Sequence, residues 1–95
     1  MTVEEMRASL SFDEPPAGFG AAMAALWWDG KGDWVRAHSL VDHLESREGM
    51  AVHAYLHRKE GVGWNADYWY GRAGRRFYRP TLDEEWGALV EGLAE

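Results

Sequence analysis

The chain has 95 residues, with 10 Lys and Arg against 16 Asp and Glu, so its formal net charge is −6. This length predicts a single domain, residues 1–95, with room for a groove rather than for an enclosed substrate cavity. The absence of cysteine excludes disulfides, thiolate metal sites and cysteine nucleophiles. Because the N-terminus is acidic and no apolar run approaches the roughly 18 residues of a membrane span, we expect a cytoplasmic protein with no membrane partner.

The first half of the chain predicts three helices. Thr2 and Glu5 have the spacing of a capping box, which indicates a short first helix. A proline favours the start of a second helix over residues 16–28, and the glycines that follow favour its end. Asp33 is a candidate N-cap for a third helix over residues 34–46, where apolar residues recur at helical spacing.

The second half of the chain predicts three more helices. The first covers residues 50–59, and Asn65 is a candidate N-cap for the next, which ends at Ala73. Thr81 and Glu84 form a second capping box before an amphipathic terminal helix. No segment alternates at the period of two that a strand requires, so the predicted fold class is all-α.

An internal repeat connects the two halves. An offset of 29 residues aligns three small residues, namely Ala25 with Ala54, Gly32 with Gly61 and Ala37 with Ala66. Small residues let two helices cross closely, and glycine permits the turn between them. The pattern predicts two helical hairpins, over residues 17–46 and 48–74, that superimpose.

This pattern resembles the tetratricopeptide and Sel1-like helical repeats, over about residues 17–75. The resemblance implies two tetratricopeptide-like helical hairpins flanked by N- and C-terminal helices, in a non-catalytic module that binds or scaffolds a protein or peptide partner. The run over residues 53–70 also resembles a stretch of small bacterial proteins, from which no activity follows.

The same resemblance places Tyr55, Arg58 and Lys59 on positions that line the concave groove of such repeats. There they would bind the carboxylate of a peptide, with Arg58 forming a bidentate pair and Tyr55 supplying flat contact area. The alternative is a solvated helix face without specific binding.

A second candidate constellation is a histidine pair. His53 and His57 are four residues apart and Glu60 follows three residues later, so all three share one helix face. Such a set can bind zinc or nickel, can line a ligand pocket with Arg58 and Tyr68, or can be hydrogen-bonded inside a polar interface. We favour the last interpretation, predict neither a metal site nor a cofactor, and expect no metal to be essential for folding.

Residues 58–79 contain six basic and two acidic residues, a balance of +4 that leaves −10 on the rest of the chain. Aromatic residues are interleaved in the basic run from Arg72 to Arg79, a pattern that favours nucleic-acid binding. The net negative charge of the whole chain, however, repels nucleic acid. We expect this segment to pair with the acidic terminal helix instead, so nucleic acid is not an expected partner. No serine lies in a Gly-x-Ser-x-Gly turn, and no catalytic residue is predicted.

The aromatic content predicts association. Six tryptophans are many for this length, and the adjacent Trp27 and Trp28 cannot both face one core. We therefore predict a homodimer that shares at least one of Trp27, Trp28 and Trp86. Three functions stay open. The first is a protein-binding or scaffolding module, the second is a protein that binds a small molecule or a metal, either as an enzyme or without catalysis, and the third is a structural homo-oligomer.

Overall fold

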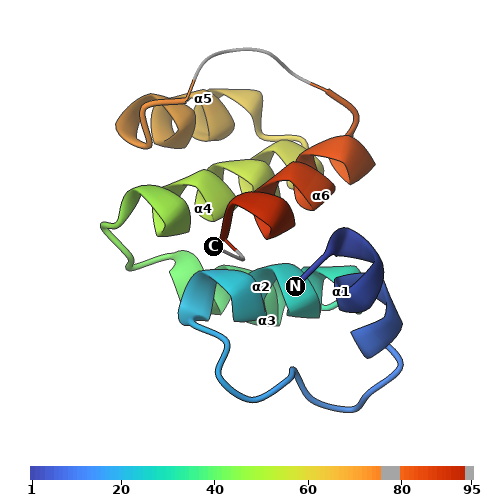
Figure 1. Ribbon diagram of the computed structural model, residues 1–95. Coiled ribbons are helices and arrows are strands. Elements are labelled where there is room, and N and C mark those ends of the chain that lie inside the picture. Colours follow the sequence, from blue (N-terminus) through green and yellow to red (C-terminus); the bar gives the residue numbers. More distant parts are fainter. Residues whose placement is uncertain (76–79, 94–95) are drawn as a thin grey trace.

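The computed structural model describes residues 1–75 and 80–93, and every regular element within them is an α-helix, as predicted. In chain order the helices are α1 (Val3–Ser9), α2 (Ala21–Gly30), α3 (Trp34–Val41), α4 (Arg47–Glu60), α5 (Gly63–Arg72) and α6 (Leu82–Leu93). Figure 1 shows α4 and α5 together in its upper part and α2 and α3 together in its lower part. Within the described ranges, no helix has both the length and the apolar character needed to cross a membrane.

Helix α4 is the centre of the fold and packs against α2, α3, α5 and α6. Its residues from Gly49 to His57 are all buried, because other helices cover it on several sides. A helix that is covered all round is normally apolar. His53 and His57 are therefore exceptional, since a buried imidazole needs polar partners.

The two hairpins, α2–α3 and α4–α5, have connections of the same geometry. Gly32 and Gly61 adopt left-handed φ angles of 89° and 92°. One backbone N–H then returns to the preceding helix in each connection, from Asp33 to Trp28 O at 2.9 Å and from Val62 to His57 O at 3.1 Å. The alanines aligned by the 29-residue offset, Ala25, Ala37, Ala54 and Ala66, are all fully buried.

The predicted start of the second helix is wrong. Helix α2 begins at Ala21 rather than near residue 16, because Gly18 takes a left-handed φ of 91° in a turn and Gly20 is extended. The helix continues to Gly30, two residues beyond the predicted end.

The predicted boundary between the third and fourth helices is also wrong. Helix α3 ends at Val41, and Ser46 does not belong to it. The hydroxyl of Ser46 instead accepts a hydrogen bond from the backbone N–H of Gly49 at 3.1 Å and caps α4, which begins at Arg47 rather than at residue 50.

Three of the four predicted N-caps are confirmed by hydrogen bonds from backbone N–H groups to the capping side chains: Glu5 to Thr2, Arg36 to Asp33 and Glu84 to Thr81. Asn65 is not a cap. Helix α5 begins at Gly63, directly after the connection at Gly61, so Asn65 lies inside the helix.

Two of the three tryptophans assigned to a dimer surface are buried within the chain. Trp27 is fully buried and donates its indole N–H to Ser9 Oγ at 3.1 Å, and Trp86 donates to Leu26 O at 2.9 Å. Neither ring is exposed in the single chain, which leaves Trp28 as the candidate for the predicted shared surface. Trp28 is half-buried beneath the guanidinium of Arg36, and the homodimer itself stays a prediction.

Candidate functional site

Three imidazoles meet between α3 and α4. The Nε2 atoms of His38 and His53 lie 3.0 Å apart, and those of His53 and His57 lie 2.9 Å apart. One ring nitrogen of each histidine lies within 4.8 Å of those of the other two. The structure thus brings the predicted pair together and adds His38 from the preceding hairpin.

The sequence analysis missed His38. Helical spacing relates residues of one helix only, whereas His38 belongs to α3 and the other two to α4. One signal was present: His38 directly follows Ala37, which was predicted to lie at a helix crossing and is fully buried.

Glu60 orients one of the three rings. Its Oε1 lies 2.6 Å from Nδ1 of His57, so the Nδ1–H group donates to the carboxylate. With the proton held on Nδ1, Nε2 of the neutral ring presents a lone pair to the other two imidazoles. A carboxylate in this position is typical of histidines that bind metals. The predicted association of His53, His57 and Glu60 is confirmed.

Two indoles enclose the cluster. The ring of Trp34 stacks on His38 at a centroid distance of 4.8 Å, and its N–H donates to Leu56 O at 2.9 Å. The ring of Trp69, on α5, lies against the ring of His53 at a centroid distance of 4.2 Å. These contacts hold the imidazoles in place and reduce their access to water.

Two of the three rings, His53 and His38, favour the neutral form. Burial, followed by the charges of His57 and His38, lowers the pKa of His53 to about 4. Burial and then His57 also lower the pKa of His38. Nδ1 of His53 is buried and has no hydrogen-bond partner within the described part of the chain. Neutral imidazole is the form that binds a metal ion.

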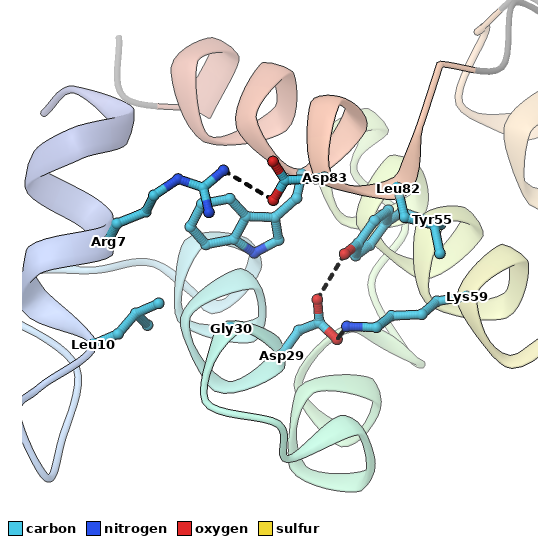
Figure 2. A pocket seen from close by; sticks show the side chains of 9 residues that line it. Arg7, Leu10, Asp29, Gly30, Tyr55, Lys59, Leu82 and Asp83 are labelled. Carbon is cyan, nitrogen blue, oxygen red and sulfur yellow. Dashed lines mark hydrogen bonds and ion pairs between the residues drawn. The ribbon is translucent and has the colours of Figure 1, made fainter.

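Tyr55 and Lys59 lie away from this cluster and around a buried carboxylate. Figure 2 shows Asp29 of α2 between them, with Tyr55 donating to one carboxylate oxygen at 2.8 Å and Lys59 to the other at 2.9 Å. Burial, followed by the charge of Asp29, raises the pKa of Tyr55. The three residues line a cavity of about 290 Å³ whose far wall carries the Arg7–Asp83 ion pair.

Arg58 holds α4 to the start of α6. It donates to Glu85 at 2.6 Å and to the carbonyl of Pro80, and Tyr70 donates to the same carboxylate. Glu85 is only 5% exposed, and Tyr55 is only 2% exposed. The expectation that Tyr55, Arg58 and Lys59 line one open groove is therefore not met, because α2 and α6 cover the first two.

Tyr68 does not join the histidines. It lies on the outer face of α5, 56% exposed, one turn after Trp64, which is 75% exposed. The guanidinium of Arg72 lies 5.0 Å from the ring centroid of Trp69 and 5.8 Å from that of Tyr68. Most of the basic aromatic run predicted after Arg72, residues 76–79, lies outside the described residues.

No protein-family model, curated protein or solved structure matches this chain. Within the described residues, the imidazole cluster is the set of side chains most suited to ligand chemistry.

Proposed function

We propose that this protein binds one divalent transition-metal ion of the zinc type through His38, His53 and His57. The observation that carries the proposal is the convergence of three imidazole nitrogens, with contacts of 2.9 and 3.0 Å between Nε2 atoms. A tetrahedral ion with Zn–N bonds of about 2.0–2.1 Å needs ligand nitrogens about 3.3 Å apart. Each of these two contacts would have to widen by about 0.3–0.4 Å to reach that spacing.

Hydrogen bonding alone accounts less well for the cluster. Nε2 of His53 faces two other Nε2 atoms, and a single N–H group at that atom can be directed at only one of them. A metal ion would use a lone pair from each Nε2, and the Nδ1–H group of His57 would continue to donate to Glu60. Imidazole donors suit zinc, copper, nickel and cobalt.

The ion is not expected to be essential for folding. Structural zinc sites normally have four protein ligands, whereas this cluster has three, and the apolar core around Trp27, Leu26 and Leu56 is buried independently of it. Chelation should leave the helical circular dichroism of the protein unchanged, and bound zinc should raise its melting temperature.

Calorimetric titration of the metal-free protein with zinc tests the proposal. We expect one ion per chain, and an affinity at least about 100-fold lower in His38→Ala, because only two imidazoles remain. His43→Ala is the matched control, since His43 is exposed and bonded to Asp42 rather than to the cluster. Equal zinc affinities in the wild type and His38→Ala, or no binding at all, would reject the metal site.

A second candidate function keeps the protein-binding module, and the outer face of α5 favours it. Trp64, Tyr68 and Arg72 lie one turn apart, and aromatic residues and arginine are the types enriched in the centres of protein interfaces. Arg72 and the neighbouring Arg75 suit an acidic peptide. The matching hairpin connections at Gly32 and Gly61 support the relation to tetratricopeptide-like repeats.

An array of acidic peptides tests this second candidate. Replacing both Trp64 and Tyr68 by alanine should weaken peptide binding at least about tenfold, because two aromatic anchors are lost. Val35→Ala is the control, since Val35 is equally exposed on α3. If the double variant binds as the wild type does, this face is not the binding surface.

A further inference from the structure

We infer that the metal centre keeps one coordination position for a small carboxylate-type ligand from outside the chain; this inference rests on the proposed function. Within the described residues the converging donors are three, His38, His53 and His57. Zinc with three protein ligands typically takes an exchangeable fourth ligand, whereas closed structural sites have four protein ligands.

The nearby carboxylates are occupied elsewhere. Oε1 of Glu60 lies 2.6 Å from Nδ1 of His57, on the other side of that ring from Nε2, so Glu60 supports a ligand instead of being one. Asp42 lies 3.1 Å from Nδ1 of His43 and is half of an exposed pair. Neither carboxylate belongs to the converging set.

An external ligand would reach the bound ion from the side of His38. His53 and His57 are buried, at 4% and 8% exposure, whereas His38 is only half-buried. The half-buried rings of Trp34 and Trp69 stand beside the cluster, against His38 and His53. An approach bounded by two indoles suits a small ligand that donates one atom.

Charge selects an anion. Three neutral imidazoles leave the two positive charges of the ion uncompensated at the donor atoms, and among the carboxylates that the structure describes Glu60 lies behind one ring. An oxygen of a carboxylate matches this charge and the single open position. Such an oxygen comes either from a free small acid or from the side chain of a protein partner.

The visible spectrum of the cobalt-loaded protein tests this inference, because cobalt absorption responds to coordination number and ligand type. We expect saturable spectral changes with azide and with acetate, and the same changes in the control His43→Ala. Acetate and a short glutamate-containing peptide are then compared: saturation at equal concentrations identifies free small acids as the ligand, and tighter saturation by the peptide identifies a partner's side chain.

Two results would overturn the inference, and they differ. Bound cobalt whose spectrum ignores azide, acetate and the peptide would show a closed centre, which rejects the open position and leaves the metal site intact. A protein that does not bind cobalt at all would reject the proposed function, and this inference with it.

Discussion

His53 is the most enclosed of the three imidazoles, and its environment makes stability depend on pH. Its pKa is lowered from 6.5 to about 4 by burial and by His57 and His38, while Asp42 and Glu60 raise it slightly. Between these two values the unfolded chain binds a proton that the folded chain does not. The free energy of unfolding of the metal-free protein should therefore fall as the pH drops from 6.5 to about 4, and this term should level off below.

Urea denaturation across this pH window measures the effect. His53→Asn removes the titrating ring, so its stability should change less with pH than that of the wild type. His43→Asn is the control, because His43 is exposed, and it should keep the wild-type slope. Identical slopes in the wild type and His53→Asn would contradict the assignment.

Glu60 acts on metal affinity through His57. Glu60→Gln keeps the length of the side chain but replaces the carboxylate that accepts the Nδ1 proton with a neutral amide. Zinc affinity should fall about 10–100-fold, as is usual when such a supporting carboxylate is lost. Glu48→Gln, an exposed position on the same helix, should bind zinc as the wild type does. Calorimetric titration of the wild type and the two variants with zinc measures these affinities. An unchanged zinc affinity in Glu60→Gln would mean that the carboxylate has no part in binding.

At this scale the sequence predicted two of the three converging histidines, and Glu60 behind one of them. The spacing of His53, His57 and Glu60 placed them on one face, because residues three and four apart on a helix are neighbours. His38 could not be predicted in the same way, since its distance from His53 depends on how α3 crosses α4. The partners of Tyr55 and Arg58, on α2 and α6, depend on helix packing in the same way.

At the scale of the helices, the two hairpin connections both require a glycine with a left-handed backbone. Gly32 and Gly61 have left-handed φ angles, and a Cβ atom at either position would meet no atom within 4 Å. Gly32→Ala and Gly61→Ala should therefore lower the free energy of unfolding through backbone strain alone, by about 1–2 kcal/mol each.

Chemical denaturation compares these variants with Gly71→Ala. Gly71 lies inside α5 with a helical backbone and open space, so alanine should stabilise the protein there by about 0.5–1 kcal/mol. Losses that differ strongly between Gly32→Ala and Gly61→Ala would contradict the equivalence of the two connections.

Helix ends that depend on local chemistry were predictable, and others were not. The capping side chains of Thr2, Asp33 and Thr81 bind backbone N–H groups within three residues, so their sequence pattern is sufficient. The third helix was predicted to reach residue 46 because Leu44 continues the apolar spacing of α3. Leu44 packs instead on Gly49 of α4, where an added Cβ would lie 2.6 Å from that of Leu44.

Across the whole molecule, buried ion pairs join the helices around α4. Arg58 and Glu85 have side-chain exposures of 20% and 6%, whereas the Arg7–Asp83 pair is 46% and 76% exposed. Arg58→Met would leave the Glu85 carboxylate buried without its guanidinium and should cost about 3 kcal/mol, the lower end of the range for breaking a buried pair. Arg7→Met should cost about 1 kcal/mol or less. Equal losses in thermal denaturation would show that Arg58 has no special structural role.

The distribution of aromatic side chains also belongs to this scale. The number of tryptophans indicates how much aromatic surface must be covered, but not which helix covers it. Ser9 at the end of α1 bonds to Trp27, and Trp86 of α6 packs onto α2, so the terminal helices bury both rings. Among the described residues, the exposed aromatic side chains are Trp64 and Tyr68 on α5 and Phe12 after α1.

X-ray absorption at the zinc edge of the zinc-loaded protein tests the metal centre most directly. The cluster predicts a spectrum with multiple scattering from three imidazoles, zinc–nitrogen distances of about 2.0–2.1 Å and one additional light ligand. His38→Ala should lose one imidazole from this pattern. A wild-type spectrum dominated by water or carboxylate oxygens, with at most one imidazole, would contradict the convergence of His38, His53 and His57 on a metal ion.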